Sequence, residues 1–193
     1  MTVVRLAFIA ALLSLPAAAL AQAPAQPSGP AAEAALAYNR IKPNILKAAE
    51  KMPADSYNYK PTPEVRTFAR VVEHVTEAQL RVCSAMNGGT VELKMTPTKT
   101  ADKSAKNSAE KDTDKDNDKD TVITALKASF AECDKAYAAL TDGGLMEVVT
   151  VGPMGKRSRV GAAWGNVAHD SEQYATLALY LRLKGLVPPS SEK

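Results

Sequence analysis

Apolar side chains recur three and four positions apart in four stretches of the chain, which cover residues 31–52, 67–87, 121–140 and 158–184. This spacing places the apolar residues on one side of a helix, so the pattern predicts four amphipathic helices. Pro43 interrupts the first stretch, which predicts either a kink or a break into two shorter helices.

Residues with known preferences for helix ends mark where the predicted helices begin and stop. Thr67 and Ser158 precede the second and fourth stretches and are expected to act as N-caps. Gly88 and Gly89 follow the second stretch, and Gly185 follows the fourth, with Pro188 and Pro189 beyond it. Glycine ends helices because it tolerates the left-handed backbone conformation, and proline ends them because it cannot continue the hydrogen-bonding pattern.

Four amphipathic helices in one domain predict an all-α fold, a four-helix bundle. The first and last connections are short, which favours antiparallel neighbours. The connection between the second and third helices is long enough to cross the bundle and leave those two helices parallel, which gives up-down-down-up topology. Residues 146–151 are β-prone and precede a turn at residues 152–155, so a small extended arm or hairpin is expected before the fourth helix.

The long connection contains a low-complexity segment, residues 94–120, with seven Lys and seven Asp or Glu and almost no apolar side chains. Such a segment cannot bury enough apolar surface to offset the entropy lost on ordering, so we expect a disordered charged loop.

The N-terminus has the features of a signal peptide. Arg5 is followed by an apolar run at residues 6–15, and residues 19–21 read Ala-Leu-Ala, so cleavage is expected after residue 21. An uncleaved anchor is the alternative, but the run is short for a bilayer. We therefore expect a periplasmic or secreted protein with no membrane association after cleavage, divided into a signal peptide (1–21), a flexible leader (22–30), the bundle (31–189) and a tail (190–193).

Composition adds two constraints. The net charge is only +3, and no basic stripe alternates with aromatic residues, so nucleic acid is not an expected partner. Cys83 and Cys133 are the two cysteines, and in an oxidising compartment they are expected to form one disulfide rather than remain two buried thiols. If the second and third helices are parallel, both cysteines come to similar heights, so this pairing and the topology support each other.

The chain has two histidines, His74 in the second predicted helix and His169 in the fourth. Gln173 follows His169 by four residues and shares its helix face. From periodicity alone, structural histidines are favoured over ligands, yet two imidazoles on converging faces could share one divalent metal ion. Glu77, one turn after His74, is interpreted as a surface acid rather than a ligand. The face of His169 also carries Ala162, Asn166, Thr176 and Tyr180, and the opposite side carries Val160, Trp164, Val167, Tyr174 and Ala178.

Several segments together resemble the DinB-like (YfiT-like) family of metal-binding four-helix bundles, which is distinct from the DNA polymerase of that name. They are the HDSEQY segment at residues 169–174, its continuation at 180–189, the loop at 59–68 and the VEHV segment at 72–75. The segments around Cys83 and Cys133 resemble an exported subgroup.

The resemblance implies an up-down-down-up bundle that holds zinc, nickel or iron through three histidines, one on the second helix and two spaced four apart on the fourth. These positions fall on His74, His169 and Gln173, so the third departs from the family pattern. Some members of the family resemble thiol transferases, and many have no known activity. The first hypothesis is a metal-dependent enzyme, thiol-transferase-like or hydrolytic. The alternatives are a non-catalytic bundle with a degenerate metal site that binds a small molecule or protein partner, and a disulfide-stiffened structural protein; each is compatible with a homodimer.

Overall fold

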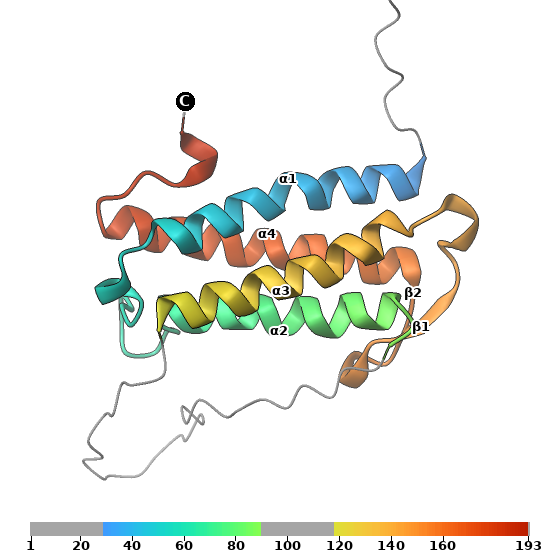
Figure 1. Ribbon diagram of the computed structural model, residues 1–193, viewed down its shortest axis with the longest axis horizontal. Coiled ribbons are helices and arrows are strands. Elements are labelled where there is room, and N and C mark those ends of the chain that lie inside the picture. The colour runs from blue at the N-terminus through green and yellow to red at the C-terminus, as the bar shows by residue number, and fades with distance from the viewer. Residues whose placement is uncertain (1–28, 90–117, 193) are drawn as a thin grey trace, which may run out of the picture.

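Four helices and a short hairpin form a single bundle in the computed structural model, which describes residues 29–89 and 118–192 (Figure 1). The expected signal peptide, most of the leader and nearly all of the charged loop lie outside these residues. Among the described helices, none is both long and apolar enough to cross a bilayer. The main elements are α1 (Pro30–Lys51), α2 (Phe68–Met86), α3 (Lys119–Ala138), β1 (Val148–Thr150), β2 (Lys156–Ser158) and α4 (Arg159–Leu183).

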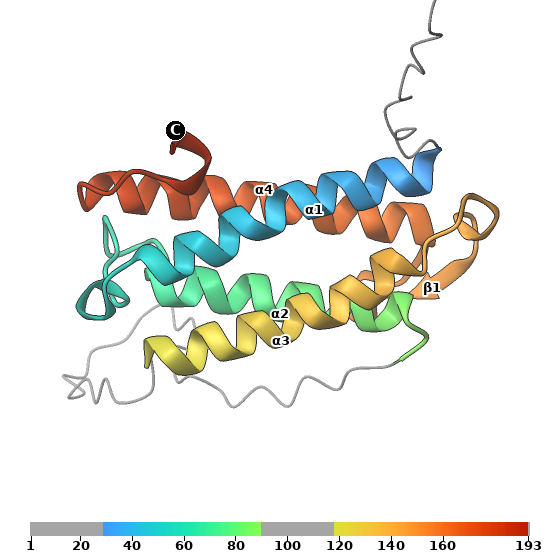
Figure 2. The ribbon, with the colours of Figure 1, turned by 45° about the horizontal axis from the view of Figure 1, so that its top comes forward.

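The helices have the predicted up-down-down-up arrangement. Figures 1 and 2 show α2 and α3 running in the same direction, with α1 and α4 running in the opposite direction. A disulfide joins Cys83 on α2 to Cys133 on α3, and their Cα atoms are 4.9 Å apart. The pairing expected from the parallel helices is therefore present in the structure.

The helix ends follow the sequence signals closely. The Thr67 hydroxyl accepts a hydrogen bond from the Arg70 amide at the start of α2, and the Ser158 hydroxyl accepts one from the Gly161 amide at the start of α4. Of the two alternatives for the first stretch, one continuous helix is observed, with Pro43 inside α1.

The β-prone segment before α4 forms a two-stranded antiparallel hairpin, in which Val149 pairs with Arg157. One expectation about α4 was wrong. Trp164 does not lie on the apolar side of this helix and is 42% exposed. Tyr180, expected on the polar face, is buried and donates a hydrogen bond to the Arg66 carbonyl. The side of α4 that is packed includes Ala163, Val167, Asp170, Tyr174, Leu177 and Leu181.

The N-terminus of α1 is capped by a residue distant in the sequence. Gly29 at the N-cap position has no side chain to accept a hydrogen bond. Instead, Asp142 Oδ1, between α3 and β1, accepts a hydrogen bond of 2.8 Å from the Ala31 amide. The two segments approach closely at this point, because a Cβ on Gly29 would lie 2.1 Å from Asp142 Oδ2 and the Gly29 φ is +106°.

The disulfide is expected to stabilise the fold strongly. It closes a segment of 50 residues, and cross-linking a loop of that length lowers the entropy of the unfolded chain by the equivalent of about 4 kcal/mol. The double variant Cys83→Ala/Cys133→Ala should lose most of that amount in urea unfolding. Non-reducing mass spectrometry of the mature protein should show one disulfide, and two free thiols would contradict the pairing.

Removing the cap of α1 should also destabilise the protein. Asp142→Ala leaves the first amides of the helix without a side-chain acceptor, which costs about 1 kcal/mol in comparable helices. Asp142→Asn keeps an acceptor oxygen and should retain most of the stability. Equal urea midpoints for Asp142→Ala and the unmodified protein would show that water caps the helix equally well.

Candidate functional site

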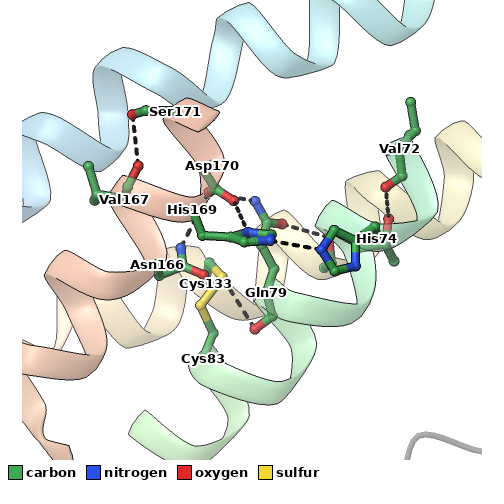
Figure 3. A network of polar contacts seen from close by, with 12 residues as sticks. Val72, His74, Gln79, Cys83, Cys133, Asn166, Val167, His169, Asp170 and Ser171 are labelled. Carbon is green, nitrogen blue, oxygen red and sulfur yellow. Dashed lines mark hydrogen bonds and ion pairs between the residues drawn. A yellow bond between two sulfur atoms is a disulfide. The ribbon is translucent and has the colours of Figure 1, made fainter. Parts of the chain in front are cut away.

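The two histidines of the chain meet between α2 and α4. His74 Nε2 and His169 Nε2 are 3.1 Å apart, and the ring planes are inclined by 68° (Figure 3). Both rings are partly buried, with the His169 side chain 25% exposed. The structure therefore brings together two side chains that are 95 positions apart in the sequence.

A buried carboxylate, that of Asp170, is next to this histidine pair. Asp170 is fully buried, and its Oδ2 accepts a hydrogen bond of 2.9 Å from the Gln79 side-chain amide on α2. The Gln79 carbonyl in turn accepts one of 2.7 Å from the Ser129 hydroxyl on α3. Asn166 donates to the same Asp170 oxygen at 3.3 Å. This network ties α2, α3 and α4 together at the height of the histidines (Figure 3).

Three buried side-chain atoms at the site have no hydrogen-bond partner among the described residues: Asn166 Oδ1, His169 Nδ1 and Asp170 Oδ1. The last two lie 3.8 Å from each other. A small rotation of either side chain would join them in a carboxylate–imidazole hydrogen bond. Such a bond fixes which imidazole nitrogen carries the proton and leaves Nε2 of His169 with its lone pair toward His74.

Electrostatics around the pair favour uncharged imidazole at His74. Burial lowers the pKa of His74 to about 4, and the interactions with Arg66 and His169 act in the same direction. Burial also raises the pKa of the Asp170 carboxyl, against the opposing influence of the nearby His169 ring and of the hydrogen bond from Gln79. At neutral pH the His74 ring is therefore neutral and can act as a ligand or a hydrogen-bond acceptor.

The distance between the two Nε2 atoms suits a shared metal ion. Two imidazoles that each bind an ion at about 2.1 Å have their nitrogens roughly 3–3.4 Å apart, and the observed separation is 3.1 Å. Gln173, the third predicted position, is partly buried one turn further along α4. Among the described residues, no cluster of three or more His, Cys, Asp or Glu side chains suits a metal ion, so two imidazoles fit and the third position offers only an amide.

Glu77 is engaged by an arginine. Its carboxylate forms an ion pair with Arg70, at 2.6 Å from Nη1, and its side chain is 18% exposed, less than expected for a surface acid. Its charge still acts on His74, where it opposes the lowering of the pKa.

A cavity of about 320 Å³ opens beside the histidine pair, between α2, α4 and the hairpin. Gln173 does not line it. The cavity instead extends from the histidines toward the beginning of α4, where Gly161 and Gly165 contribute no side chains. Its size is at the lower end of small-molecule sites in proteins.

Sequence reasoning missed the polar residues behind the histidines, although a signal was present. Gln79 lies at helical spacing among Val72, Val75, Val82 and Met86, and Asp170 lies among Val167, Tyr174 and Leu177. A polar residue within an apolar stripe must find a buried partner. Arg81 and Arg157 of the cavity carried no such signal, because arginines on exposed faces are common.

The low pKa of His74 should be visible by NMR in the metal-free protein. The unfolded ring binds a proton near pH 6.5, whereas the folded ring stays neutral down to about pH 4. The unfolded state therefore binds more protons between these values, and stability should fall as the pH falls from 6.5 to 4.

Two arginine variants test the cause of this shift. Arg66→Gln should raise the His74 pKa, and Arg40→Gln, on an exposed part of α1, should not. A His74 pKa near 6.5 in the unmodified protein would contradict the effect of burial.

Comparison with solved structures shows the same fold in distant proteins. A DinB-like protein from Bacillus cereus ATCC 10987 superimposes with a TM-score of 0.58 at 15% identity, over 81% of this chain and 93% of that chain. A conserved protein from Enterococcus faecalis gives a TM-score of 0.57 at 14% identity, over 78% and 94% of the two chains. At these identities the likeness concerns the fold alone.

Sequence comparison assigns the family. No curated protein matches the chain. The sequence profile of the DinB superfamily matches residues 37–177, a span that includes α2, α3, the hairpin, both histidines and most of α1 and α4. The chain therefore belongs to the DinB superfamily.

Proposed function

We propose that the protein is an exported metal-binding bundle, in which His74 and His169 hold a divalent cation, zinc, nickel or iron, with Gln173 as a weaker third ligand or as a partner of bound water. The observation that carries the proposal is the 3.1 Å separation of the two Nε2 atoms across α2 and α4. The histidines come from two different helices, so the site forms only when the bundle is folded.

The residues around the pair have separate roles in this proposal. Asp170 orients His169 through Nδ1 and keeps its Nε2 toward the cation position. Gln79 and Asn166 hold Asp170 in place through its other oxygen. The adjoining cavity admits a small substrate. When bound, the cation would act as a Lewis acid that lowers the pKa of a thiol or water nucleophile, the chemistry common to thiol transfer and hydrolysis.

Export is supported by two independent features. Residues 1–21 have the charge, apolar run and small-residue site of a cleaved signal, and the structure contains a disulfide, which is typical of oxidising compartments. We therefore assign the mature protein to the periplasm or the extracellular space.

A second function is favoured by one observation, the amide at position 173. A neutral amide is a weaker ligand for first-row metals than imidazole or carboxylate, so the site would be degenerate and the cavity would serve a non-catalytic bundle that binds a small molecule or a protein partner.

Metal content of the purified mature protein distinguishes these two functions. The unmodified protein should bind about one zinc ion per chain by titration and mass spectrometry, and His74→Ala should lose it. Gln173→His should tighten binding by about tenfold or more, since imidazole is the better donor. Circular dichroism should show that both variants keep the helical fold.

Two other outcomes are informative. Metal bound by Gln173→His but not by the unmodified protein would support the degenerate site. If neither protein binds zinc, nickel or iron, the histidine pair is structural and the metal proposal is wrong.

A further inference from the structure

The cavity beside the histidines, here called the hairpin cavity, has an unusual distribution of charge. Its charged and titratable lining residues are His74, His169, Arg81 and Arg157, and no carboxylate of the described residues lines it. Outside the lining, the charge of Arg66 lowers the pKa of His74 and the charge of Glu77 acts in the opposite direction. Arg81 and Arg157 therefore give the lining a positive formal charge, which favours an anionic group at their end of the cavity.

The two arginines that line the cavity are not engaged with acids of the bundle. Within residues 29–89 and 118–192, neither Arg81 nor Arg157 forms an ion pair or a side-chain hydrogen bond. By contrast, Arg70 pairs with Glu73 and Glu77, and Arg159 pairs with Glu147. Free guanidinium groups at one cavity can take a carboxylate in a two-point interaction.

The arginines and the histidines occupy different ends of the cavity. Arg81 follows His74 by seven residues, so both lie on the same face of α2, about 10 Å apart along the helix. The stem of Arg81 is held against the hairpin, because a Cβ on Gly152 would lie 3.5 Å from Arg81 Cδ. Arg157 projects from β2 of the same hairpin. A ligand held at the arginine end can therefore reach the histidine pair only if it is extended.

The wall between these ends is mostly apolar, with Asn166 as its polar member. Ala78, Val82 and Val151 line it, as do Gly161 and Gly165 on α4. A Cβ added at Gly165 would meet nothing within 4 Å, so the absence of a side chain there leaves space that a ligand can occupy. A fully hydrated inorganic anion would gain nothing from such a wall, whereas an apolar organic body would.

We propose that the hairpin cavity binds a small organic carboxylate, with its carboxylate between Arg81 and Arg157, its apolar body along Val82 and Val151, and its far end at the histidine pair. This assignment deepens the proposed function by naming the ligand class, and it rests on that function only for the role of the histidine end. The binding itself requires no metal.

Matched ligand pairs test the assignment in the chelator-treated, metal-free protein. Phenylacetate should bind measurably by NMR or calorimetric titration, and phenylacetamide, which has nearly the same shape without the charge, should bind at least about tenfold more weakly. Inorganic phosphate should bind more weakly than phenylacetate. Equal binding of phenylacetate and phenylacetamide, or preferential binding of phosphate, would overturn the proposal.

Substitutions locate the site within the cavity. Arg81→Gln and Arg157→Gln should each weaken phenylacetate binding by about tenfold, while Arg40→Gln removes the same charge from an exposed position on α1 and should leave it within about twofold. Gly165→Leu should abolish binding by filling the open space without disturbing the fold, since leucine is a better helix former than glycine. Unchanged binding in the Arg81→Gln/Arg157→Gln double variant, or in a folded Gly165→Leu protein, would show that the anion binds elsewhere.

The same preparations separate this inference from the metal proposal. If the protein binds zinc but not phenylacetate, the metal proposal stands and the carboxylate proposal is wrong. Phenylacetate binding with no affinity for zinc would support the carboxylate site in a non-catalytic bundle.

Discussion

The hydrogen bond between the Gln79 amide and the buried Asp170 carboxylate is the constraint on which the site depends. A carboxylate with no exposed surface is tolerated only where donors satisfy it, because an unsatisfied buried charge costs several kcal/mol. Gln79 meets this need from α2, and Ser129 on α3 fixes Gln79. The bond sets the rotation and height of α4 against α2, and His169, the neighbour of Asp170, consequently faces His74.

The seam between α2 and α4 combines rigidity with open space. On the α3 side, the disulfide and the buried Ser129 contact join α2, which carries His74, to α3. Toward the start of α4, Gly161 and Gly165 line the cavity without side chains, and residues of the hairpin form another part of its wall. A binding site needs both properties, because fixed groups orient a ligand at low entropic cost and a cavity removes it from water.

Membership of the DinB superfamily explains the arrangement without determining the chemistry. Two solved bundles share the fold at 14–15% identity, so very different side chains fill the same helical framework. Function therefore depends on the residues grafted onto that framework. In this chain the candidate residues are the imidazole pair, the Gln173 amide proposed as third ligand, and Arg81 and Arg157, which form no ion pair within the described residues.

The sequence by itself determined the four helices, their caps at Thr67 and Ser158, the parallel α2 and α3 and the two histidines, because these follow from local periodicity, capping preferences and loop length. The sequence pattern misassigned two residues of α4, because Tyr180 is buried and Trp164 is exposed. Small and apolar residues are mixed evenly along this helix, so their spacing does not mark one apolar side. Only the tertiary structure decided that Asp142 caps α1, that Asp170 stands behind His169 and that Arg81 and Arg157 share a cavity. Each of these contacts joins residues from separate elements, and their register depends on packing that no single helix encodes.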